Sequence, residues 1–118
     1  MVKHLIKVAD KFPFPGARFR ELGPQSGEEF KQYLIAQINK IYGDDFIQNK
    51  DSEVVIDLDG SAGYGSSFLE EGFGGLIREG VPAKIVNKFT FISNEEPELI
   101  DEIKDYINKA LIAKNGSK

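Results

Sequence analysis

The sequence contains no cysteine and only one histidine, His4. Without cysteine, disulfides, thiolate metal sites and cysteine nucleophiles are all excluded. A single histidine near the N-terminus argues against a multi-histidine metal site or a Ser-His-Asp triad. His4 lies on the apolar side of a predicted strand, so a packed, hydrogen-bonded role is expected, with a ligand role as the alternative. We therefore expect no metal, no cofactor and no enzymatic activity.

The chain also lacks a surplus of basic residues and any long apolar run. Its formal net charge is −4, and it has no dense Lys/Arg cluster to neutralise phosphates. No apolar run reaches the ~18 residues that a membrane span requires, and the N-terminus has no signal-peptide core. These absences predict a cytoplasmic protein that does not bind nucleic acid and has no membrane span.

A chain of 118 residues suits a single domain. We expect that domain over residues 1–114, followed by a frayed tail at 115–118. Four segments that alternate in hydrophobicity or are rich in β-branched residues predict strands. The second is expected to form a hairpin with the first. The third is expected to be buried on both faces. These segments are Val2–Ala9, Ala17–Arg20, Val54–Asp59 and Phe89–Ile92. The fold class expected is α/β, a single-layer mixed or parallel four-stranded sheet with packed helices.

Helices are predicted between the later strands. Ser26 and Glu29 have the spacing of a capping box, and apolar residues follow at helical spacing until Gly43. Ser67 and Glu70 have the same spacing, which predicts a second helix to about Arg78. A C-terminal helix is expected after Pro97. Residues 81–88 fit either a short helix or a strand.

The features that bear on function lie between Asp57 and Arg78. A buried strand ends in a glycine-rich loop, and a helix then begins at two serines. Ligands and partners bind at such strand ends, and a helix start favours a phosphoryl group. The candidate phosphoacceptors are Ser66 and Ser67. The candidate partner-binding or anion-binding residues are Asp59, Gly60, Gly63, Tyr64, Gly65, Arg18 and Arg20.

Each of these features also has a purely structural interpretation. The glycine-rich turn and the serines can simply cap a helix. Arg18 and Arg20 can contact an anion or acidic partner, or can be solvated charges on an edge hairpin. Gly72, Gly74 and Gly75, inside the second helix, indicate either close packing or a flat surface left for a partner.

Residues 54–61 also resemble the first motif of haloacid-dehalogenase-like phosphatases. That resemblance implies Asp57 as nucleophile, Asp59 as general acid/base and a bound Mg²⁺. That family needs a later lysine and a later acidic pair at the ends of further parallel strands, but only 58 residues follow Gly60, and Asp44-Asp45 precedes the motif rather than following it. The alternative is that Asp57 and Asp59 accept hydrogen bonds from loop amides.

A longer resemblance covers nearly the whole chain. The chain resembles a bacterial STAS-like domain family of unknown function, which is related in fold to the STAS domains of anti-sigma factor antagonists. The residues that carry this resemblance are Phe14-Pro15-Gly16, Arg18-Phe19-Arg20, Gly23-Pro24, Ser26-Gly27-Glu28-Glu29-Phe30, Asp57-Leu58-Asp59-Gly60, the run from Gly63 to Glu71, and Phe73-Gly74-Gly75-Leu76.

The resemblance implies a STAS-like fold and a role in signalling by partner switching. In the antagonists, a serine kinase of the histidine-kinase-like ATPase superfamily phosphorylates a serine at the start of the helix after the central strand. Ser66 falls at that position and Ser67 follows it. Gly65 stands where the antagonists usually carry Asp, and Phe68 stands where they carry Gly, so kinase recognition is expected to be altered or absent.

Three hypotheses follow for the function. The first is a regulatory protein-interaction module, a phosphoprotein that works with a histidine-kinase-like ATPase. The second is a domain that senses a nucleotide or another anion at the glycine-rich loop. The third is the Mg²⁺-dependent phosphatase.

Overall fold

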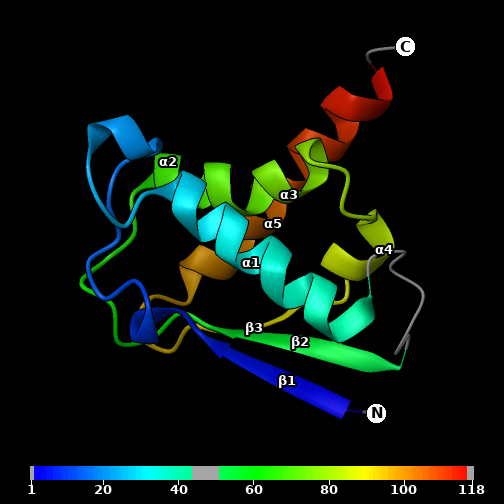
Figure 1. The fold of residues 1–118 in the computed structure, drawn as a ribbon, viewed down its shortest axis with the longest axis horizontal. Helices are drawn as coiled ribbons and strands as arrows, with labels where there is room; N and C mark the ends of the chain where they lie inside the picture. Colours follow the sequence, from blue (N-terminus) through cyan, green and yellow to red (C-terminus); the bar gives the residue numbers. More distant parts are fainter. Residues whose placement is uncertain (1, 44–50, 117–118) are drawn as a thin grey trace.

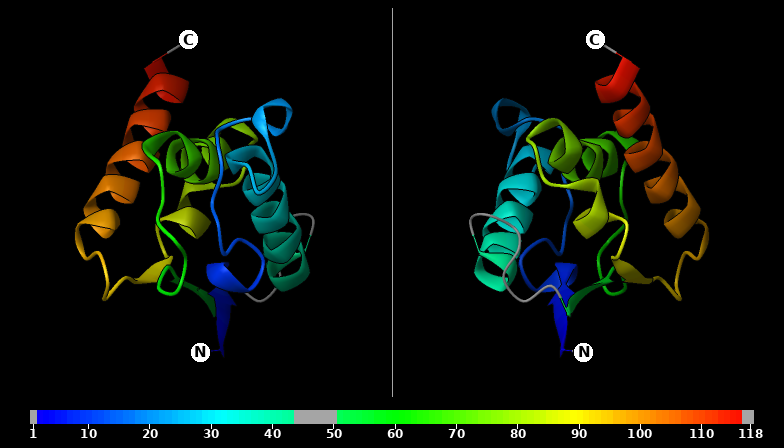
Figure 2. Two further views of the ribbon diagram at one scale, coloured as in Figure 1. Left: turned by 90° about the vertical axis from the view of Figure 1, so that its left-hand side faces the viewer. Right: turned by 90° about the vertical axis from the view of Figure 1, so that its right-hand side faces the viewer.

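The structure is a computed structural model that describes residues 2–43 and 51–116. A single sheet in the order β1-β2-β3 forms its base, and both strand pairs are parallel. The strands are β1 (Val2–Lys7), β2 (Ser52–Asp57) and β3 (Thr90–Ile92). The helices lie on one side of this sheet (Figures 1 and 2). The α/β prediction is confirmed, but the described residues form three strands rather than four.

The central strand is buried on only one face. Val54 and Ile56 point toward the helices and are fully buried, while Val55 and Asp57 on the other face are partly exposed. The prediction of burial on both faces was wrong because no described helix covers the second face. β2 therefore alternates in burial although its pairing is parallel.

The predicted strand at Ala17–Arg20 does not form. The carbonyl oxygens of Ala17 and Arg18 accept the backbone N–H groups of Gly27 (2.8 Å) and Glu28 (2.9 Å). These carbonyls satisfy the otherwise unpaired donors of a helix N-terminus instead of joining a sheet. The segment continues into a 3₁₀ turn, η2 (Arg20–Leu22), so β1 has no hairpin partner.

Helix α1 (Gly27–Tyr42) begins at the predicted capping box. Ser26 Oγ accepts the Glu29 N–H at 3.1 Å, and Glu29 Oε1 accepts the Ser26 N–H at 3.1 Å. One face of α1 packs into the core, and the helix ends at Gly43, whose φ of 81° suits glycine. Its fully buried apolar residues are Phe30, Leu34 and Ile38.

The second predicted helix is a continuous helical segment packed between α1 and α5 (Figure 2). It consists of α2 (Ser66–Leu69), a π-helical stretch η3 (Glu70–Gly74) and α3 (Gly75–Arg78). Phe68, Phe73 and Leu76 are fully buried. A Cβ on Gly72 would lie 2.5 Å from Phe30 Cδ2, so close packing against α1 explains this glycine.

The remaining elements close the core. The ambiguous stretch contains a short helix, α4 (Ala83–Val86), followed by β3 and then by α5 (Glu98–Gly116). Leu99, Ile103 and Ile107 bury one face of α5 against the helical segment. The acidic pair Asp44-Asp45 and residues 117–118 lie outside the described part of the chain.

Candidate functional site

The loop after β2 is tied to the connection between β3 and α5. Asp57 Oδ1 accepts the Asp59 N–H at 3.0 Å. The two carboxylate oxygens of Asp59 accept the N–H groups of Asn94 (3.2 Å) and Glu95 (3.0 Å). In return, Glu95 Oε1 accepts the Gly60 N–H at 2.8 Å. Both aspartates therefore bond loop amides, and this alternative from the sequence is confirmed.

Tyr64 braces the same loop from inside. Its hydroxyl donates to the Leu58 carbonyl oxygen at 2.8 Å and lies 3.0 Å from Ser61 Oγ. Burial, reinforced by the charges of Asp57 and Asp59 and opposed by the Ser61 contact, raises the pKa of Tyr64 to about 12. The phenol therefore stays protonated at neutral pH and keeps its donor. The loop is thus a fixed support for the residues that follow it.

Ser66 and Ser67 are both exposed on the first turn of the helical segment. Gly65 is the N-cap residue, and no side chain caps this helix start. The predicted capping box between Ser67 and Glu70 was wrong for two reasons. Ser67 already lies inside the helix, and the Glu70 carboxylate is bound to two arginines. Neither serine hydroxyl is therefore used as the predicted cap.

A shallow pocket of about 480 Å³ lies beside the two serines. Two apolar side chains on its wall face solvent, Phe19 with 41% and Leu22 with 66% of its surface exposed. The pocket is lined by Gly16, Ala17, Arg18, Phe19, Leu22, Gly65, Ser66, Ser67 and Phe68. Phe19 and Leu22 were not predicted as site residues, because their exposure depends on how the 16–25 loop folds over the start of α1.

The structure separates the two arginines that the sequence grouped together. Arg18 lines the pocket, and its Nη1 lies 2.6 Å from Glu70 Oε1 and 3.4 Å from Glu71 Oε1. It is therefore paired with acidic residues of its own chain rather than solvated on a hairpin. The Arg20 side chain is exposed, and its backbone N–H donates to Glu28 Oε1 at 3.0 Å. Arg20 does not line the pocket.

Arg18 belongs to an ion-pair network along the helical segment. Arg78 Nη1 and Nη2 donate to the two Glu70 oxygens at 2.7 and 3.0 Å. The bonds from Arg78, with those from Arg18, lower the pKa of Glu70 despite its partial burial. Lys31 from α1 donates to Glu71 at 2.9 Å. Burial acts to lower the pKa of Lys31, but the Glu71 bond and charge raise it overall.

The arrangement defines an α/β domain with a braced loop at the end of its central strand and an exposed serine pair on the helix that follows. The family model of the STAS-like domain of unknown function (DUF4325) matches residues 26–99. The chain therefore belongs to this family. No curated protein and no solved structure matches the chain.

Two features of residues 2–43 and 51–116 limit the kinds of site they form. None of their helices is long and apolar enough to cross a membrane. No group of three or more His, Asp or Glu side chains among them is arranged to hold a metal ion. The side chains around the loop offer exposed hydroxyls, apolar groups and paired charges.

Proposed function

We propose that this domain is a regulatory module that binds a protein partner through the surface around Ser66. The observation that carries the proposal is an exposed serine pair on a helix start, next to a pocket with exposed Phe19 and Leu22. Exposed aromatic and aliphatic groups of this kind are typical of the centre of protein interfaces. The braced loop keeps the serines in place before a partner arrives.

The partner proposed is an ATPase of the histidine-kinase-like superfamily that also acts as a serine kinase. In the reaction, Ser66 Oγ bonds to the γ-phosphorus of ATP, the bond from that phosphorus to the bridging oxygen breaks, the hydroxyl proton passes to a base of the kinase, and ADP leaves. A phosphate on Ser66 would lie at a helix start, one turn before Glu70. Arg18 lines the same pocket and can turn to the phosphate, because Glu70 keeps its bonds to Arg78.

The experiment is to incubate the domain and its Ser66→Ala and Ser67→Ala variants with ATP and each histidine-kinase-like ATPase of the source organism in turn. Mass spectrometry should find one added phosphate on the wild type and none on Ser66→Ala. Phosphate on another residue, or none at all, would remove the phosphoacceptor part. Partner binding is then tested separately.

For binding, Leu22→Glu should weaken the complex with the same ATPase at least tenfold, since it places a charge in the apolar part of the pocket wall. The matched control is Ile112→Glu, because Ile112 on α5 is equally exposed, 63% against 66%, but does not line the pocket. Equal binding by both variants would show that the partner does not use this surface.

The two other hypotheses have less support. For a nucleotide or anion sensor, two backbone donors of the loop are already used, because the N–H groups of Gly60 and Ala62 bond Glu95 and Pro13. The uncapped helix start at Gly65 is what the structure still offers to an anion. A phosphatase would need both aspartates available for chemistry, but Asp59 accepts two backbone N–H groups. The same loop contacts instead support a structural role for these residues.

A further inference from the structure

Strand β1 has one edge that no strand covers in residues 2–43 and 51–116. β1 pairs with β2 alone, and the segment predicted to be its hairpin neighbour binds the start of α1 instead. An edge strand directs alternate backbone N–H and C=O groups outward, where an added strand can bond them. The sheet therefore offers a template for an extended chain.

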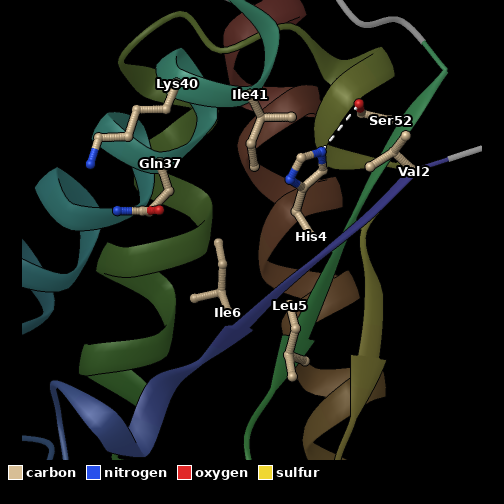
Figure 3. Close-up of a pocket in the computed structure, with 8 residues that line it drawn as sticks. All are labelled: Val2, His4, Leu5, Ile6, Gln37, Lys40, Ile41 and Ser52. Atoms are coloured by element: carbon tan, nitrogen blue, oxygen red, sulfur yellow. Dashed lines mark hydrogen bonds between the residues drawn. The ribbon is translucent and has the colours of Figure 1, made fainter.

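A groove of about 430 Å³ runs beside this edge, between β1 and the C-terminal half of α1. In Figure 3, His4 and Ile6 rise from the strand toward the helix, and Gln37 and Lys40 lie above them on α1. The groove is lined by Val2, His4, Leu5, Ile6, Gln37, Lys40, Ile41 and Ser52. Every second side chain of an added strand would point into it.

The lysines on β1 bear on what kind of strand can pair with its free edge. Lys3 and Lys7 are exposed on the helix-free face. In the register with β2 they lie opposite Glu53 and Asp57, but neither lysine forms an ion pair with any other described residue. Antiparallel pairing of two copies centred on Leu5 would set Lys3 against Lys7 twice, which is unfavourable. Acidic side chains at alternate positions of a partner strand would instead be attracted to both lysines.

We propose that the free edge of β1 binds an extended acidic segment of a partner protein by strand addition. The segment becomes a fourth strand beside the observed three. Its Asp or Glu side chains lie next to Lys3 and Lys7, and its apolar side chains enter the groove under α1. This site lies at the opposite end of the molecule from α2 (Figure 1), so the proposal does not depend on the Ser66 surface.

The test uses the full chain and three synthetic eight-residue peptides. One alternates glutamate with valine, the second alternates lysine with valine, and the third is the glutamate peptide with alternate amides N-methylated. Only the first should bind in a fluorescence-anisotropy titration, and it should slow hydrogen exchange in β1. N-methylation should abolish binding, because it removes the donors that pair with the strand edge.

A charge-reversed variant then tests the role of the lysines. Lys3→Glu with Lys7→Glu should reverse the preference, so that the lysine peptide binds at least about tenfold more tightly than the glutamate peptide. The matched control is Lys84→Glu with Lys109→Glu, which makes the same change in net charge on exposed helical residues away from β1. The control should keep the wild-type preference.

Three results would overturn the proposal. The first is no binding of the glutamate peptide. Lys3 and Lys7 would then serve to prevent another chain from pairing with the strand edge. The second is equal binding of the N-methylated peptide, which would mean a charge attraction without strand pairing. The third is sedimentation showing a dimer of the free chain with β1 amides protected, because a second copy would then occupy the edge.

Discussion

The chain has two glycine-rich stretches, 60–65 in the loop after β2 and 72–75 in the helical segment. In the loop, a Cβ on Gly63 or Gly65 would meet no atom within 4 Å. In the helix, a Cβ on Gly72 would lie 2.5 Å from the Phe30 ring. The first stretch has space around it, whereas the second lets two helices approach closely. The same residue type therefore marks a surface in one place and a contact in the other.

Backbone conformation sharpens this comparison. Gly60 and Gly63 have φ values of 95° and 135°, which L side chains rarely adopt. Gly65 has an ordinary φ of −79°, so neither conformation nor space requires glycine there. Within the loop, Gly60 and Gly63 shape the chain, while Gly65 is open to substitution. This difference separates residues that hold the fold from one that can affect recognition.

The largest effect is expected for Gly72→Ala. The added methyl must displace the fully buried Phe30 ring, and overpacking of this kind costs about 2 kcal/mol even though alanine favours helix. Urea unfolding measures the change. Gly65→Ala is the control and should cost about 0.5 kcal/mol or less, since its Cβ has open space. Equal effects of the two substitutions would contradict the contrast between the stretches.

A smaller loss of stability is expected from a substitution of Glu70, which lies beside Gly74 in the second glycine-rich stretch and belongs to the ion-pair network. Glu70 Oε2 would lie 2.6 Å from a Cβ on Gly74, so the carboxylate occupies that space. Glu70→Gln should lower stability by about 1–2 kcal/mol at neutral pH by removing the charge that binds Arg18 and Arg78. The Lys109–Asp105 pair is more exposed, so Asp105→Asn should cost less than about 0.5 kcal/mol.

The pH dependence of the Glu70 effect has a definite sign. The folded-state pKa of Glu70 is below its ordinary value of 4.5. Its stabilisation is therefore fully present above that value and is lost as the pH falls through the lower, folded-state pKa. Unfolding curves of the wild type and Glu70→Gln should converge in acid. A difference that stays constant down to low pH would mean that the carboxylate charge is not the cause.

The sequence was sufficient for elements whose signals are local. The Ser26–Glu29 capping box and the apolar spacing of Phe30, Leu34 and Ile38 predicted α1, and the β-branched run predicted β2. The strand at Ala17–Arg20 failed because its carbonyls bind the start of α1, a contact that no pattern within those residues encodes. Local patterns describe an element, but they do not determine which distant backbone groups compete for it.

The candidate site shows the same division. Exposed Ser66 and Ser67 at a helix start follow from the order of strand, glycine loop and helix. The pairing of Arg18 with Glu70 joins residues 52 positions apart, and the bond of Glu95 to the Gly60 N–H joins residues 35 apart. These contacts depend on how the loops fold over the strand ends. The sequence predicted a capping role for Glu70 because the distant Arg18 partner is not visible in the local pattern.

A small structural effect and a direct functional test are both expected from an aspartate at Gly65. Gly65→Asp introduces the residue that anti-sigma factor antagonists usually carry before their phosphoserine. The fold should tolerate it, because the position has open space and aspartate is a good N-cap residue, so the change in stability should stay within about 1 kcal/mol.

If Ser66 is the phosphoacceptor, Gly65→Asp should change its phosphorylation rate by the ATPase severalfold, as followed by mass spectrometry over time. Gly63→Asp is the matched control, since it adds the same charge to the same loop but forces a φ of 135° on a side chain that resists it. Gly63→Asp should therefore lower the free energy of unfolding, whereas Gly65→Asp should leave it nearly unchanged. An unchanged rate for Gly65→Asp, with the fold intact, would mean that the kinase does not recognise this position. Gly65 would then play no part in recognition by the partner.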